Sequence, residues 1–174
     1  NLTSESSGYF NTNINDSKLL FDDYLENCIT VNTKLDSGKS KHGKHYDAML
    51  IDMVMYNDII KNSVTNHGEF RYCKIYNSNL NESVIRDNYI SKCKVNACDV
   101  VRTELISCYI TNIINNIGHT IEDSYLFDCI IDMDGFNSDD FINLLNKNNI
   151  KYTVKKDNKL LIHGRINSES IKFW

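Results

Sequence analysis

The chain has 174 residues, of which 41% are hydrophobic and 24% charged, and its formal net charge is −4. These values predict one soluble domain with a sizeable core. The sequence contains no proline and only 7 glycines, which excludes collagen-like and Pro-rich linker architectures. The slightly acidic balance argues against direct nucleic-acid binding through phosphate contacts, and no apolar run reaches the 18 or so residues that a membrane span needs.

Residues 1–49 are predicted to form an N-terminal cap or irregular segment. Residues 1–17 are polar and indicate irregular structure. Leu19–Val31 is a mixed apolar run that fits a helix followed by a strand. The pattern does not decide the fold of this segment.

A basic, polar stretch lies between Ser37 and His45, and its lysines are Lys39, Lys41 and Lys44. We predict a solvated surface loop here. The alternative is that the three lysines form a basic contact loop for an acidic partner, since a cluster of one charge attracts the opposite one.

From residue 70 onward an apolar residue recurs at every fifth position. The nine consecutive centres are Phe70, Ile75, Leu80, Ile85, Ile90, Val95, Val100, Leu105 and Ile110. After an 11-residue step the phase resumes at Ile121, Leu126 and Ile131, and upstream Val54, Ile59 and Val64 fit after a six-residue step to Phe70. A period of five matches neither an amphipathic helix nor a flat strand.

A second, mostly small residue lies two positions before each centre. These residues are Gly68, Cys73, Ser78, Ser83, Asn88, Cys93, Cys98, Thr103 and Cys108, followed by His119, Ser124 and Cys129. This alternation resembles the pentapeptide-repeat family over residues 50–132. The resemblance implies an all-β fold, a right-handed parallel β-helix in which both residues point inward and four pentads complete one square turn. The chain departs from the family in its Ile and Val centres and in two phase slips, which predict loops or bulges between coils.

On such a 20-residue turn, residues 50–132 make about four coils, and Cys73 lies below Cys93. Coils stacked about 4.8 Å apart pair their backbones and build a continuous inner column. Buried cysteine packs as a small hydrophobe. The six cysteines, Cys28, Cys73, Cys93, Cys98, Cys108 and Cys129, are therefore predicted to be reduced, mostly in packing roles, which favours the cytoplasm or a virion as location.

The sequence carries no recognisable catalytic or metal-binding motif. The cysteines form no C-x-x-C pair and have no histidine at zinc-ligand spacing, and no nucleophile, histidine and acid follow a known signature. We therefore expect no catalytic residue, no cofactor and no metal.

Residues 133–174 are predicted to form a helix and a hairpin that cap the solenoid. Ser138 and the two acids after it fit a helix N-terminus, and Asn148 and Asn149 end the helix. The predicted apolar face consists of Phe141, Leu144 and Leu145.

The hairpin strands are expected at Ile150–Lys156 and Lys159–His163, on either side of a two-residue turn at Asp157 and Asn158. A cap is the simplest interpretation, because a solenoid has open ends. The alternative is a separate dimerisation or docking module.

Stacking outward residues 20 positions apart gathers apolar side chains at one edge of the predicted prism. This strip consists of Val84, Tyr89, Ile106, Tyr109 and Ile130. A contiguous exposed apolar strip usually marks a covered surface. Either the chain's own cap or N-terminal segment covers it, or it is a face for a protein partner, a role that suits tyrosine.

A late cluster of acids is the candidate for glycoside hydrolysis, which needs two carboxylates about 5–9 Å apart. The cluster comprises Glu122, Asp123, Asp128, Asp132 and Asp134. Acids beside a helix start more often serve capping and solubility. His119, at an inward small position, is predicted to be a hydrogen-bonded core residue.

Together these features predict a non-enzymatic, rigid β-solenoid that acts as a scaffold or protein-binding module, through a protein partner or self-association as a homo-oligomer. The bias towards Asn, Ile and Lys and the absence of an initiator Met favour a processed phage or viral structural protein. One alternative is a DNA mimic that modulates a topoisomerase or another DNA-handling enzyme, as some pentapeptide-repeat proteins do. A third is a carbohydrate-active β-helix.

Overall fold

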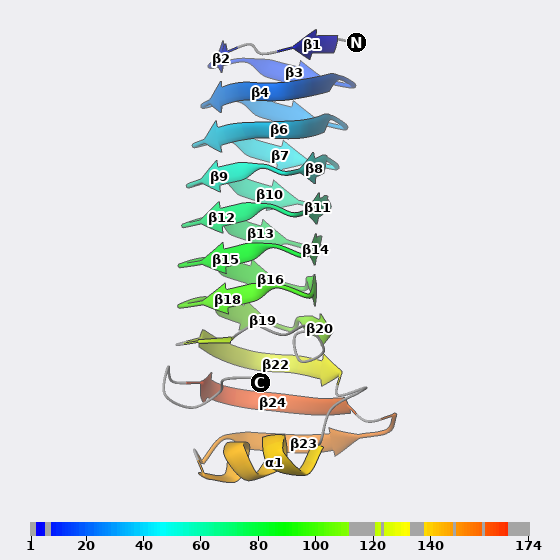
Figure 1. Cartoon of the computed structure of the whole chain (residues 1–174), viewed down its shortest axis with the longest axis vertical. Coiled ribbons are helices and arrows are strands. Elements are labelled where there is room, and N and C mark those ends of the chain that lie inside the picture. The colour runs from blue at the N-terminus through cyan, green and yellow to red at the C-terminus, as the bar shows by residue number, and fades with distance from the viewer. Residues whose placement is uncertain are drawn as a thin grey trace.

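A computed structural model describes residues 3–5, 8–111, 121–122, 124–132, 138–147, 149–157 and 159–166. These residues form a single 24-stranded sheet, coiled on itself, and one helix. Figure 1 shows the short strands stacked in layers along one long axis, from the N-terminus at one end to β23, β24 and α1 at the other. The parallel β-helix predicted from the sequence is confirmed, with about seven turns.

Three columns of strands form the three faces of the coil, which we call faces A, B and C. Face A consists of β3 (Asn13–Asn15), β5 (Ile29–Val31), β7 (Lys44–Tyr46), β10 (Ile59–Lys61), β13 (Lys74–Tyr76), β16 (Tyr89–Ser91), β19 (Glu104–Ile106) and the first half of β22 (Ser124–Asp132).

Face B consists of β1 (Thr3–Glu5), the first halves of β4 (Lys18–Glu26) and β6 (Lys34–Lys41), β8 (Met49–Ile51), β11 (Val64–Asn66), β14 (Asn79–Asn81), β17 (Lys94–Asn96), β20 (Tyr109–Thr111) and the second half of β22. Face C consists of β2 (Gly8–Phe10), the second halves of β4 and β6, β9 (Val54–Tyr56), β12 (Glu69–Arg71), β15 (Val84–Arg86), β18 (Asp99–Val101) and β21 (Ile121–Glu122).

The strand register corrects the predicted turn length. Ile75 pairs with Ile60 on one side and Ile90 on the other, so partners are 15 residues apart and a turn contains three pentads rather than four. Cys73 therefore lies next to Asn88 and not Cys93. A five-residue period is compatible with either turn, because each pentad has the same local geometry, and only the pairing of distant strands distinguishes them.

Each pentad makes a corner with one residue in the left-handed backbone region. These residues have φ between 46° and 59° and recur every five positions through most of the solenoid, from Asn32 to Ser107. Asn and Asp adopt this conformation most readily among residues other than glycine. Ten of the nineteen such residues between Asn11 and Ser107 are Asn or Asp, which gives part of the asparagine content a structural reason.

The small inward residues link neighbouring coils through their side chains. The hydroxyl of Ser78 donates to the carbonyl of Tyr76 at 2.8 Å and accepts the N–H of Ser63 at 3.1 Å. Cys93 acts similarly, since its thiol donates to the carbonyl of Ser91 at 3.3 Å and accepts the N–H of Ser78 at 3.4 Å. Ser, Thr, Cys and Asn suit the small position because their side chains supply both a donor and an acceptor.

The solenoid extends far upstream of residue 50, and the predicted irregular N-terminal segment is wrong for the described residues there. Strands begin at Thr3 and stack in parallel. Upstream of Phe70 the inward centre is Thr65, which is fully buried, whereas Val54 is 42% exposed. The predicted six-residue slip before Phe70 is therefore absent. The sequence pattern did not reveal this phase, because the inward residues Thr65, His45 and Ser40 are polar.

Four buried polar side chains meet inside these N-terminal coils. The His45 ring hydrogen-bonds through Nδ1 to the hydroxyl of Thr30 at 2.8 Å and through Nε2 to that of Ser40 at 2.9 Å. Asp58 lies 3.6 Å from His45 Nε2 and accepts the N–H of Gly43. A Cβ at Gly43 would lie 2.6 Å from His45 Nε2, so only glycine leaves room for the ring.

The C-terminal end of the solenoid is capped as predicted. Strand β22 pairs in antiparallel fashion with β24 (Lys159–Ile166), which pairs with β23 (Lys151–Lys155), and α1 (Ser138–Lys147) precedes the hairpin. Leu145, Leu160 and Ile162 join the core. They cover the apolar interior that the last coil would otherwise expose.

No helix in the described residues is long and apolar enough to cross a membrane.

Candidate functional site

The 15-residue turn gathers apolar side chains on face A. Each strand there turns its first and third side chains outward. From β5 to β22 nine of the fourteen outward residues are aliphatic or aromatic: Ile29, Val31, Tyr46, Ile59, Tyr76, Tyr89, Ile106, Tyr125 and Phe127. Six steps of about 4.8 Å make this strip roughly 30 Å long. We call it the aromatic face.

One lysine and three tyrosines contact one another on the aromatic face. The ammonium of Lys61 lies 6.0 Å from the ring centre of Tyr46 and 5.4 Å from that of Tyr76, within the range of cation–π attraction. The rings of Tyr76 and Tyr89 are 5.8 Å apart and tilted by 50°. These contacts hold the long side chains against the sheet and give the surface a fixed shape.

At the C-terminal end the aromatic face meets the cap. The rings of Tyr125 and Phe127 stack at 6.4 Å, and Phe127 contacts the ring of His163 edge-on at 6.2 Å. Tyr125 and Phe127 are 41% and 44% exposed. The carboxylate of Asp128 lies 2.9 Å from His163 Nδ1. The cap therefore borders this end of the face but leaves both rings open to solvent.

The predicted apolar strip divides among three faces. Tyr89 and Ile106 lie on the aromatic face, Val84 lies on face C, and Tyr109 pairs with Ile130 on face B. The sequence pattern located the correct kind of side chain but joined the wrong neighbours, because it used a 20-residue turn.

The Tyr109 end of face B is covered by the chain itself. The Tyr109 hydroxyl donates to Asp132 at 2.6 Å, and Lys159 of the cap hairpin lies 5.9 Å from its ring centre. The hydrogen bond to Asp132 is the main cause that raises the pKa of Tyr109.

The three lysines of the predicted basic loop lie in strands. Lys39 and Lys41 belong to β6 on face C, and Lys44 belongs to β7 on face A. The corner between faces C and A therefore separates Lys44 from the other two. Strands form here because Ser40 and His45 occupy inward positions, as an aliphatic residue would.

Face B carries a ladder of asparagines where the aromatic face carries rings. The amide of Asn81 donates to Asn66 Oδ1 at 3.0 Å, that of Asn96 donates to Asn81 Oδ1 at 3.4 Å, and Thr111 donates to Asn96 Oδ1 at 2.9 Å. These side chains bond mainly to each other from coil to coil. The ladder stabilises the stack and presents fewer unused polar groups to a partner.

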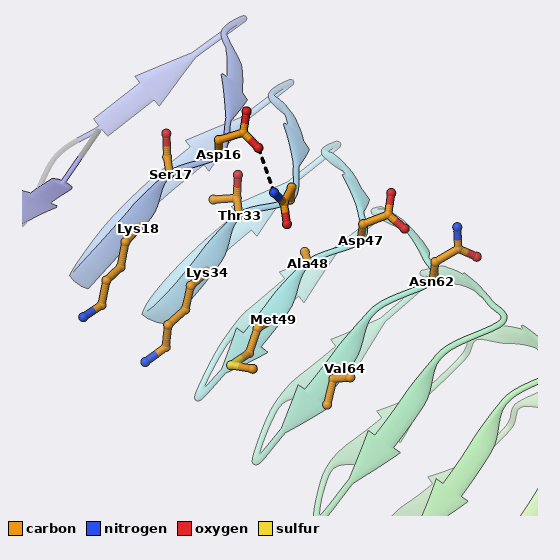
Figure 2. A pocket seen from close by; sticks show the side chains of 11 residues that line it. Asp16, Ser17, Lys18, Thr33, Lys34, Asp47, Ala48, Met49, Asn62 and Val64 are labelled. Atoms are coloured by element: carbon orange, nitrogen blue, oxygen red, sulfur yellow. Dashed lines mark hydrogen bonds between the residues drawn. The ribbon is translucent and has the colours of Figure 1, made fainter. Parts of the chain in front are cut away.

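A shallow groove of about 740 Å³ follows the corner between faces A and B in the first coils (Figure 2). Its floor is open because Ser17, Thr33 and Ala48 are small. One rim is a row of corner residues that includes Asp16 and Asp47, and the other rim is the row Lys18, Lys34, Met49 and Val64. Asn32 donates to Asp16 at 2.7 Å. The charged groups stand on the rims of the groove, and its small floor residues carry no charge.

The buried thiols are poorly suited to redox chemistry. Burial raises the pKa values of Cys73, Cys93 and Cys98 to about 12. All six cysteines are free and buried. Thiolates, not thiols, are the reactive species, so Cys73, Cys93 and Cys98 are inert at neutral pH, as expected for packing residues.

Two acids of the late cluster are described with their side chains, and each of them contacts a neighbouring group. Asp128 lies against His163 and Asp132 accepts the Tyr109 hydroxyl. His119, Asp123 and Asp134 lie outside the described residues, as does the side chain of Glu122. Within the described part of the chain, no three His, Cys, Asp or Glu side chains are grouped so that they could hold a metal ion.

Comparison with known proteins finds distant similarity to solved structures. No protein-family model matches the sequence, and a search of the curated proteins finds no match. Among solved structures, full-length QnrB1, a plasmid-mediated fluoroquinolone resistance protein, is 15% identical, with 68% of this chain and 93% of QnrB1 covered and a TM-score of 0.28. HetL, a pentapeptide-repeat protein involved in heterocyst differentiation regulation in the cyanobacterium Nostoc sp. strain PCC 7120, is 8% identical, with 70% and 52% covered and a TM-score of 0.24. The strand pairing of the chain itself shows a parallel β-solenoid built from five-residue repeats.

Proposed function

We propose that the protein is a rigid, non-enzymatic scaffold that binds a partner protein through the aromatic face. The observation that carries this proposal is that nine of the fourteen outward residues of face A from β5 to β22 are aliphatic or aromatic. Contiguous exposed apolar surface marks interaction sites, and tyrosine is enriched at the centres of protein interfaces.

The solenoid suits such a role because its backbone is tied together at every coil. The N–H of Asn77 donates to the carbonyl of Ser91 in the next coil, and that of Asn79 donates to Ser63 in the coil before. This pattern repeats along the stack. A surface built on it loses little conformational entropy when a partner binds.

Photo-crosslinking tests the proposal. A photoreactive phenylalanine analogue would replace Tyr76 or Ile106 on the aromatic face, and Asn79 or Lys94 on face B as matched controls. In cells of the organism that encodes the chain, we expect discrete crosslinked species from the first pair alone. A Tyr46→Ser/Tyr89→Ser variant should lose them, because it removes two rings of the face while leaving the core intact.

Absence of crosslinks from face A, or equal crosslinks from face B, would contradict the proposal. A crosslinked species of twice the chain's mass would identify a second copy as the occupant. Light scattering over a range of concentrations would then confirm a homo-oligomer. A phage or viral source has no support from the structure or from the comparisons.

The two other functions predicted from the sequence have less support. A DNA mimic needs a continuous acidic surface, but face A carries three lysines and face C carries Lys39, Lys41, Arg71 and Arg86. A carbohydrate-active enzyme needs two unoccupied acids, but Asp128 and Asp132 are both engaged by neighbours.

A further inference from the structure

The charged residues of the aromatic face form a regular pattern with its apolar ones. Lys44 and Lys74 lie on either side of Ile59 at one edge of the face, while Lys61 lies between two tyrosines at the other edge. Each of three successive coils therefore contributes one lysine and one apolar side chain, in alternating order.

These lysines have few competing partners. Lys44, Lys61 and Lys74 are exposed, and none of them forms an ion pair with a described residue. Three cations elsewhere on the solenoid do form ion pairs, Arg102 with Asp87, Lys34 with Asp36 and Arg71 with Glu69. The nearest acid on the outward side of face A is Glu104, two coils beyond Lys74.

We propose that the occupant of this part of the face is an acidic, apolar protein segment in extended conformation. Its carboxylates would lie on Lys44, Lys61 and Lys74, and its apolar side chains on Tyr46, Ile59 and Tyr76. Charge complementarity supports this partner, since unpaired cations beside apolar surface favour acids that bring their own apolar groups. The inference rests on the proposed function and names the chemistry of its partner.

The arrangement favours a protein segment over single-stranded nucleic acid, which also binds surfaces of lysine and aromatic rings. Base stacking needs free ring faces, but Lys61 lies over the rings of Tyr46 and Tyr76, and Tyr89 packs against Tyr76. Aliphatic side chains such as Ile59 offer nothing to a base or a phosphate.

Fluorescence anisotropy with labelled peptides tests the inference on the whole chain. The first probe is a ten-residue peptide in which Glu and Leu alternate, the second has Lys in place of Glu, and the third is a ten-nucleotide oligothymidine. We expect only the acidic peptide to bind at micromolar concentration. Raising the salt from about 0.05 to 0.5 M should weaken it, because salt screens exposed charges.

Variants locate the binding on face A. A triple variant should weaken binding of the acidic peptide at least tenfold; it combines Lys44→Gln, Lys61→Gln and Lys74→Gln. The matched control, Lys39→Gln, Lys41→Gln and Lys94→Gln on faces C and B, removes the same charge and should change binding less than twofold. Circular dichroism would show that both variants keep the fold.

Equal effects of the two triple variants, or no binding of the acidic peptide, would overturn the inference. Preferential binding of oligothymidine would overturn it in favour of nucleic acid. Crosslinks from Tyr76 and Ile106 to a protein would in that case still support the proposed function. Their absence would refute the proposed function whatever the peptides do.

Discussion

The N-terminal and C-terminal coils have the same backbone but different cores. Between residues 70 and 110 every inward centre is aliphatic or aromatic, and nearly all are fully buried. Between residues 30 and 65 the centres include Thr30, Ser40, His45 and Thr65, also buried. The comparison shows that apolar centres are sufficient but not required, because hydrogen bonds among Thr30, Ser40 and His45 satisfy polar centres inside the core.

The largest expected effect is on the aliphatic half. Phe70→Ala should lower the free energy of unfolding by about 3–5 kcal/mol, because it leaves a cavity where a fully buried ring stood. Urea denaturation followed by circular dichroism measures it. Val54→Ala, at an exposed outward position, is the control and should stay within about 0.5 kcal/mol.

In the polar half, Asp58→Ala should cost about 3 kcal/mol in the free energy of unfolding. It leaves the N–H of Gly43 and the ring of His45 without their acidic partner in a dry core. Asp58→Ser copies the residue that serves this position in the next pentads and should cost less than half as much. Equal losses for both variants would show that the contact with His45, rather than the bond to Gly43, stabilises these coils.

The small-residue link between coils should be worth less. Ser78→Ala removes the acceptor of the Ser63 N–H and should cost about 1–2 kcal/mol by the same urea measurement. Ser78→Cys should lose less, since Cys93 performs this role one coil away. A neutral Ser78→Ala would refute the role assigned to the small position.

One change should make the two halves more alike and stabilise the protein. The Thr65 hydroxyl is buried and has no hydrogen-bond partner among the described residues. Thr65→Val replaces it with a methyl of similar shape and should raise the free energy of unfolding by about 1 kcal/mol. A loss of stability would mean that the hydroxyl is satisfied in solution.

The smallest expected effect is on the buried thiols, which should not react with a thiol reagent at neutral pH. A disulfide reagent at pH 8 should label Cys73, Cys93 and Cys98 no faster than the chain unfolds, since burial raises their pKa values to about 12. The ordinary value is 9.0, so the unfolded chain releases these protons first. Stability should therefore fall as the pH rises from 9 towards 12. Rapid labelling in the native state would contradict the buried assignment.

The repeat could be predicted wherever its centres are apolar. The apolar centres from Phe70 to Ile110 predict a period of five. The helix start at Ser138 and the turn at Asp157 predict the helix and hairpin of the cap. The upstream coils were not predicted, because Thr65 and His45 are polar and interrupt the apolar period. The aromatic face was missed for another reason. Tyr76 and Tyr89 are neighbours only when a turn has 15 residues.

From Phe70 to Ile110 the sequence by itself determined which side chain of each pentad points inward, because burial requires an apolar residue at fixed spacing. The sequence also contains no proline. This suits the structure, because backbone N–H groups donate hydrogen bonds from coil to coil. Only the tertiary structure decided that three pentads close a turn. The number of pentads depends on how residues 15 apart pack and pair, and that choice placed the tyrosines and lysines of face A side by side.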